Sequence, residues 1–199
     1  MNKSNEISTE RLCWVLEQNQ EWIKNCDTKT TTILALIGVI FTVLFTSDSI
    51  AKIIQIWTIF FYSENLCFAR VYLLFTVVAW LIFVMGIYYF WQVLNARLNN
   101  KKYQCPSDYK SNLYFGDIVN YDIDVYSSNI KSLGEEELRD DLSMQIYICA
   151  DICNQKFMYY SEGMKYMGFG VMFILILLGF GYFSILGGVL YGSKESCGL

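Results

Sequence analysis

Three long stretches without a charged side chain constrain the fold more than any other feature of this sequence. They lie between Lys29 and Asp48, between Arg70 and Arg97, and between Lys165 and Lys194. A helix needs roughly 20 mainly apolar residues to cross the hydrocarbon core of a bilayer. The second and third stretches exceed that length, and a run of threonines helps to complete the first. The pattern predicts three transmembrane helices.

The positive charges predict how the chain is oriented in the membrane. Most lysine and arginine residues lie before the first span or between the second and the third. Because cytoplasmic segments carry the excess of these residues, we expect the amino terminus and the long middle segment in the cytoplasm. The predicted segments are a cytoplasmic amphipathic helix (1–29), a first span (30–47), an external loop with an interfacial helix (48–70), a second span (71–93), a cytoplasmic helical domain (94–165), a third span (166–192) and an external tail (193–199).

A fourth apolar stretch, from Ile53 to Tyr62, is too short to cross the membrane. We expect a helix that lies at the external interface, with Trp57 and Tyr62 at headgroup depth. A re-entrant segment is the alternative. A cleaved signal peptide fits poorly, because the amino-terminal part of the chain is long and polar.

Helical spacing of apolar residues continues beyond the spans. No proline or glycine interrupts the sequence before span one, so we expect one helix from about Thr9 through the membrane. Glu135 and the two glutamates after it suit the positive end of a helix dipole. A second long helix is therefore expected from Glu135 into span three, with Gly163 as its one soft point.

Two further elements complete the predicted cytoplasmic part. Span two is expected to extend past Arg97 to about Tyr103, and another helix is expected between about Asp117 and Leu133. The sequence shows no credible set of strands. The predicted fold class is an all-α membrane protein, in which three transmembrane helices have cytoplasmic helical extensions that form a small bundle.

Glycines are frequent in the predicted third span. In a bilayer, small residues permit close approach of two helices. The alternative is that these glycines face lipid. The residues concerned are Gly168, Gly170, Gly179, Gly181, Gly187 and Gly188.

The composition argues against several classes of function. The chain has no histidine, which removes the commonest general base and the commonest metal ligand. No phosphate-cradling glycine loop or nucleophile motif is present, so we expect no enzyme activity, no catalytic residue and no cofactor. A net charge of −4 argues against nucleic-acid binding. Seven cysteines without a C-x-x-C pair suggest reduced packing residues and no metal site.

Two short patterns are candidates for ligand binding. Asp27 and Lys29 stand at the entry of span one. They either anchor the helix at the interface or pair with another helix of the bundle. Tyr114, Phe115 and Asp117 stand where a loop is expected to enter a helix. They form either a hydrophobic staple with a capping carboxylate, or an aromatic shelf for a base next to helix-start N–H groups.

A third pattern lies along one predicted helix. Asp141, Gln145, Ile148, Ile152 and Lys156 are spaced by three or four residues and therefore share one stripe. The two isoleucines indicate that the stripe faces inward. The polar members either bond across the bundle or offer a base-reading amide and a phosphate-binding ammonium group. The spacing does not decide between these alternatives.

At these residues the sequence resembles the transmembrane effectors of Pycsar, the bacterial pyrimidine-cyclase antiphage system. The shared features, in order, are D-x-K at Asp27 to Lys29, F-G-D-I at Phe115 to Ile118, and the series of Asp141, Gln145-Ile146, Ile152 and Lys156. The resemblance extends from about Gln18 to Leu177. Each motif is short, and their joint order relative to the spans is the more specific signal.

The resemblance implies a function. In this family a partner cyclase senses infection and makes cyclic UMP or cyclic CMP, and the effector then damages the inner membrane and stops the host cell before phage spreads. We therefore expect a homo-oligomeric, multi-pass protein of the bacterial inner membrane whose ligand site lies in the helical bundle. The phosphate is expected to meet Lys29, Lys156 or Arg139, and the base is expected to meet Tyr114 or Phe115. The other candidate ligand residues are Asp27, Asp117 and Gln145.

Three rival interpretations remain open at this point. The first is a membrane scaffold without a ligand. The second is a constitutive small channel or transporter subunit, although its pathway would be expected to contain charged residues and these spans contain none. The third is a small membrane effector from a related nucleotide-signalling defence system.

Overall fold

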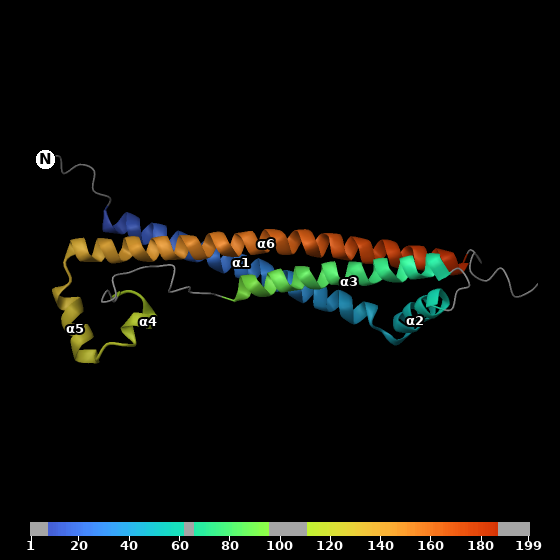
Figure 1. Ribbon diagram of the computed structural model, residues 1–199. Helices are drawn as coiled ribbons and strands as arrows, with labels where there is room; N and C mark the ends of the chain where they lie inside the picture. The colour runs from blue at the N-terminus through green and yellow to red at the C-terminus, as the bar shows by residue number, and fades with distance from the viewer. Residues whose placement is uncertain (1–7, 62–65, 96–110, 187–199) are drawn as a thin grey trace, which may run out of the picture. The chain divides into compact units, whose positions relative to one another are not determined.

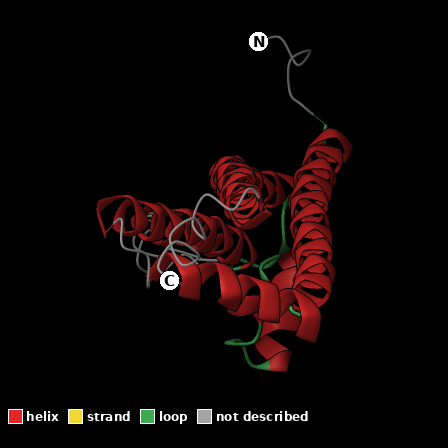
Figure 2. Ribbon diagram, turned by 90° about the vertical axis from the view of Figure 1, so that its right-hand side faces the viewer, coloured by secondary structure: helices red, strands yellow, loops and turns green. Residues whose placement is uncertain are grey.

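A computed structural model describes residues 8–61, 66–95 and 111–186, and all regular structure within these ranges is helical (Figures 1 and 2). The elements are α1 (Thr9–Leu44), α2 (Ser47–Phe61), α3 (Leu66–Leu94), α4 (Phe115–Ile118), α5 (Ile123–Ser132) and α6 (Glu135–Leu186). The all-α fold class is therefore confirmed.

Three of these helices are long and apolar enough to cross a membrane, which confirms the predicted number of spans. They cover Thr9–Val43, Ala69–Leu94 and Glu135–Ser184. The predicted continuity is also confirmed, because α1 and α6 run unbroken from polar sequence into apolar sequence. The orientation of the chain and the boundaries between cytoplasmic and external segments stay predictions.

The chain divides into two compact units. Unit 1 consists of residues 1–29 and 93–158, and unit 2 consists of residues 30–92 and 159–199. Helices α1 and α6 each contribute residues to both units.

Unit 2 contains two clusters of buried apolar side chains. One joins α2 to α3 through Ile56, Phe60, Ala69 and Tyr72, with the rings of Phe60 and Tyr72 stacked 3.9 Å apart. The other joins α3 to α6 through Phe83, Phe90 and Met167, and α1 packs against it. Helix α2 corresponds to the predicted interfacial helix, but it begins earlier than expected, at Ser47. Tyr62 lies outside the described residues.

Glycines set the close approach of α3 and α6. A Cβ added at Gly170 would lie 2.7 Å from the Cα of Phe83, and one at Gly86 would lie 2.7 Å from the backbone nitrogen of Met167. At Gly163, a Cβ would lie 2.9 Å from the ring of Phe90. Gly163 is thus a packing position inside an unbroken helix, and its role as a soft point stays a prediction.

The sequence left open whether the glycines of the third span pack against helices or face lipid. Some of them pack against helices and others do not. Gly170 and Gly181 face neighbouring helices, and a Cβ at Gly181 would lie 2.7 Å from the Ile56 side chain. Gly168 and Gly179 have nothing within 4 Å of an added Cβ. Gly187 and Gly188 lie outside the described residues.

In unit 1, the prediction of a single helix between Asp117 and Leu133 is wrong. The structure has two short helices there, α4 and α5, which Figure 1 shows near the amino-terminal end of α6. The side-chain amide of Asn120 donates to the carbonyl of Gly116 at 2.7 Å, which ties it to the backbone of α4. Asparagine and aspartate side chains compete with the helical hydrogen-bond pattern and favour turns, which is consistent with a break at Asn120 to Asp122.

Helix α3 ends at Leu94, before Arg97. The extension predicted from Arg97 to Tyr103 lies outside the described residues. The loop that is described again from Ser111 leads into α4, and it is this loop that carries the first polar cluster of unit 1.

Candidate functional site

A closed polar cluster joins the 111–114 loop to α4 and α6. The Ser111 hydroxyl donates to Asp141 Oδ1 at 2.6 Å and accepts from Gln145 Nε2 at 3.1 Å. The Ser111 backbone N–H donates to Asp117 Oδ2 at 3.1 Å, and the Asn112 N–H donates to Asp141 Oδ2 at 2.9 Å. We call these residues (Ser111, Asp117, Asp141 and Gln145) the Ser111 cluster.

The Ser111 cluster is largely buried. Asp141 is 2% exposed, Ser111 3% and Gln145 9%. A buried polar group without a partner is costly, so each bond here holds the loop in one position. The inward-facing stripe is confirmed for Asp141, Gln145 and Lys156. Asp117 Oδ2 and Gln145 Nε2, which belong to two of the residues predicted to bind the ligand, are engaged within the protein.

Sequence reasoning missed Ser111 and Asn112. Tyr114 is the N-cap of α4 but makes no capping side-chain bond. The Ser111 hydroxyl instead accepts from the N–H groups of Leu113 and Tyr114, both at 3.0 Å. A serine a few residues before a helix start is a recognised local signal for such bonds. Its bonds to residues 30 or more positions away have no local signal.

Replacing Ser111 with alanine is expected to lower the free energy of unfolding by about 1–3 kcal/mol, because the buried carboxylate of Asp141 loses its hydroxyl donor. Ser143→Ala is the matched control, since Ser143 is exposed on α6, two residues after Asp141. Chemical denaturation in detergent measures both changes. Equal stability of the two variants would contradict the described cluster.

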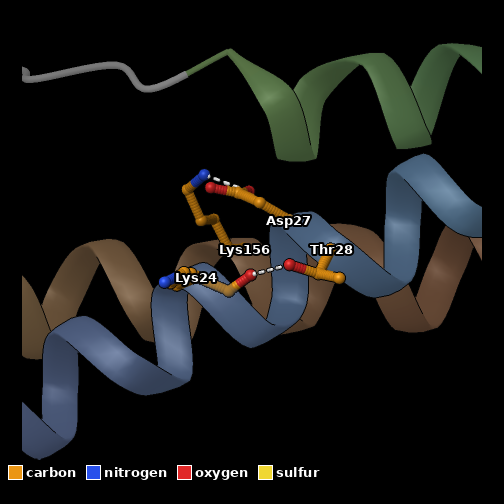
Figure 3. A network of polar contacts seen from close by, with 4 residues as sticks. All are labelled: Lys24, Asp27, Thr28 and Lys156. Carbon is orange, nitrogen blue, oxygen red and sulfur yellow. Dashed lines mark hydrogen bonds and ion pairs between the residues drawn. The ribbon is translucent and has the colours of Figure 1, made fainter.

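The second polar contact of unit 1 is an ion pair between α1 and α6 (Figure 3). Lys156 Nζ donates to Asp27 Oδ1 at 2.5 Å. The side chain of Lys156 is 7% exposed and that of Asp27 is 38% exposed. The ring of Trp22, five residues before Asp27, lies with its centroid 6.0 Å from that of Phe157, the residue after Lys156. Of the two interpretations of Asp27, pairing with another helix is therefore the one that the contacts support.

Cysteines line the same contact between the helices. Cys26, next to Asp27 in sequence, is 1% exposed. Burial raises the pKa of its thiol, and the negative charge of Asp27 raises that pKa further. Burial also raises the pKa of the Cys149 and Cys153 thiols. A raised thiol pKa lowers the reactivity of a cysteine, as expected for a packing residue.

The remaining predicted ligand residues lie in more open positions. Phe115 is 72% exposed, and its ring centroid lies 4.8 Å from that of Tyr114. Lys29 is exposed on α1. Arg139 lies 3.6 Å from Glu135, one turn earlier on α6. Among the described residues, no group of three or more histidine, cysteine, aspartate or glutamate side chains is placed to hold a metal ion.

The eight predicted ligand residues do not form one compact site. Gln145 and Lys156 are eleven positions apart on the same helix, which separates them by roughly 16 Å at 1.5 Å per residue. The contacts bring Asp117 and Gln145 together around Ser111, and they bring Asp27 and Lys156 together separately.

Comparison with known proteins gives a consistent result. The family model described as the Pycsar effector protein domain matches residues 11–183. The chain is also similar to a curated Pycsar effector protein, GmPycTM of Gulbenkiania mobilis, with 25% identity over 194 residues that cover 90% of this chain and 97% of the relative. No solved structure matches the chain.

Proposed function

Since the chain belongs to the Pycsar effector family and is therefore an antiphage defence effector, we propose that a cyclic pyrimidine nucleotide binds its cytoplasmic helices and that binding disrupts the inner membrane. The family implies a cyclic nucleotide signal from a partner cyclase, and the three spans make the protein multi-pass. The ligand of the proposal is cyclic UMP or cyclic CMP. The proposed protein is a ligand-gated homo-oligomer and not an enzyme.

The observation that carries the proposal is the ion pair between Asp27 and Lys156. Among the described contacts of unit 1, Lys156 is the buried cation that is paired with a carboxylate. A phosphate offers the same negative charge and oxygen acceptors as that carboxylate. In the proposal, the nucleotide phosphate replaces Asp27 on Lys156, which removes the ion pair between α1 and α6.

The consequence for the membrane follows from helix continuity. Both partners of the pair belong to helices that continue into candidate spans, α1 and α6. A ligand shifts an equilibrium only as far as its affinity differs between two states. A nucleotide that binds only when Asp27 has left Lys156 favours the unpaired arrangement of these helices. The spans then repack, and the bilayer loses its integrity.

Calorimetry on the full-length protein in detergent tests nucleotide binding. The wild type is expected to give heat with cyclic UMP or cyclic CMP, and Lys156→Met is expected to bind at least about tenfold more weakly, because a charge-assisted bond to phosphate is lost. Lys165→Met is the matched control, since Lys165 is exposed on the same helix and paired with Glu162 at 2.7 Å.

The outcomes separate this proposal from its rivals. No heat with either nucleotide favours the membrane scaffold without a ligand. Heat that is identical in Lys156→Met and Lys165→Met removes Lys156 from the site and contradicts the exchange of partners, although not nucleotide binding as such. Dye release from liposomes in the absence of nucleotide favours the constitutive channel.

A further inference from the structure

Unit 2 contains an apolar cavity of about 570 Å³. Its walls come from α1, α2, α3 and α6, so it lies among the helices that are apolar enough to cross a membrane. Trp57 of α2 and Trp80 of α3 both line it. None of its lining residues belongs to the polar contacts of unit 1.

The chemistry of the walls disfavours a charged ligand. No lining side chain carries a charge. The three hydroxyl groups that line the cavity each donate to a backbone carbonyl of the protein: Thr58 to Ile54 at 2.8 Å, Tyr72 to Leu177 at 3.0 Å, and Thr76 to Tyr72 at 2.9 Å. Because these donors are already used, a nucleotide would find no cationic group and no free hydroxyl hydrogen in the cavity. The polar side-chain groups of the lining are otherwise the indole N–H groups of Trp57 and Trp80, and the many aliphatic and aromatic side chains favour an apolar occupant.

The size of the cavity restricts the occupant further. A helix about 10 Å wide fills roughly 420 Å³ in each 5.4 Å turn, so a span of a second copy would fit for little more than one turn. Water is a poor occupant, because a water molecule needs two to four polar partners. An empty cavity would forfeit dispersion contacts along its walls. A flexible hydrocarbon chain meets all three constraints.

The surroundings of the cavity supply such a chain. The lining residues Ile40, Ile54 and Leu175 are 54%, 58% and 56% exposed. In a membrane-spanning region, the medium that contacts exposed aliphatic side chains is lipid hydrocarbon. Trp57 is 40% exposed. Tryptophan is enriched at the membrane interface, which is where the head group of the lipid would lie.

We propose that unit 2 binds one phospholipid by inserting an acyl chain into the cavity between α1, α2, α3 and α6. The bound chain would complete the packing of α2 against the spans. The recognition is of the hydrocarbon and not of a particular head group, because the walls carry no charge.

Tryptophan quenching by a phospholipid with brominated acyl chains tests the proposal. Two full-length variants each keep a single tryptophan, Trp80 in the cavity wall or Trp91, which is 61% exposed and lines no part of the cavity. With bromolipid added in small amounts to detergent micelles, quenching of Trp80 is expected to saturate at stoichiometric lipid. Quenching of Trp91 is expected to rise only in proportion to the bromolipid content of the micelle.

Filling the cavity supplies the specific control. Val171→Phe places a ring at an exposed lining position and is expected to abolish the saturable quenching of Trp80. Val84→Phe places the same ring at an exposed position of α3 outside the cavity and is expected to leave it unchanged. Proportional quenching of both tryptophans, without saturation, would overturn the proposal.

A second measurement uses the wild-type chain, so it does not depend on the stability of the tryptophan variants. A phospholipid with a photoactivatable acyl chain is crosslinked to the protein, and the labelled residues are mapped by mass spectrometry. The proposal expects labels concentrated on the lining residues of α2 and α6. Labels that instead follow exposure alone, with Leu81 and Phe183 as heavily marked as Ile54, would contradict it.

Discussion

Replacing Gly170 with leucine is expected to destabilise unit 2 by about 3 kcal/mol or more. An added Cβ would lie 2.7 Å from the Cα and 2.8 Å from the backbone nitrogen of Phe83. These are backbone atoms, which cannot rotate away as the end of a side chain can. The substitution therefore forces α3 and α6 apart and opens the cluster around Phe83 and Met167. Thermal unfolding in detergent, followed by fluorescence, measures the loss.

Gly168 provides the matched control, because it lies two residues earlier on the same helix and nothing lies within 4 Å of its added Cβ. Gly168→Leu is expected to leave the stability unchanged or slightly increased, since leucine is a better helix former than glycine. An equal loss in both variants would show that the contact between α3 and α6 is not made at Gly170.

Asp27→Ala is expected to lower the free energy of unfolding by about 3 kcal/mol, because it leaves the buried ammonium group of Lys156 without its partner. The value belongs at the low end of the range for buried pairs, since Asp27 is itself 38% exposed. Under the proposed function, the same variant mimics the nucleotide-bound arrangement. It is therefore also expected to release dye from liposomes before any nucleotide is added.

Two further variants isolate the contribution of the pair. Glu162→Ala removes one partner of the exposed pair with Lys165 and is expected to cost far less. Asp27→Ala combined with Lys156→Met replaces the buried cation with an apolar side chain of similar length, and it is expected to recover most of the lost stability. If Asp27→Ala is as stable as the wild type, the pair does not hold α1 to α6.

Local sequence was sufficient to predict the long helices. The chain before span one has no proline or glycine, and the periodicity from Glu135 onward continues into the third span, so α1 and α6 were predicted as unbroken helices. The spacing of Asp141, Gln145 and Lys156 likewise predicted a buried stripe, since residues three or four apart share one helix face.

The partners of those buried groups were not predictable, because they come from distant parts of the chain. Asp141 and Gln145 bond to Ser111, which lies in a loop without periodicity. The periodicity of α6 placed Lys156 on the buried face but did not identify Asp27 as its partner across 129 positions. The sequence also does not distinguish Gly170 from Gly168, because only the packed neighbours decide which face of α6 meets α3.

Nucleotide-triggered dye release from proteoliposomes is the most direct test of the central proposal, that a cyclic pyrimidine nucleotide acts on the membrane through Lys156. The protein is reconstituted in vesicles that contain a self-quenched dye, and cyclic UMP or cyclic CMP is added. The account predicts that wild-type vesicles stay sealed until one of these nucleotides is present, and that Lys165→Met responds as the wild type does. Lys156→Met, which like Asp27→Ala lacks the ion pair, is expected to release dye before nucleotide is added. Wild-type vesicles that stay sealed with both nucleotides, or that leak equally without them, would contradict the account.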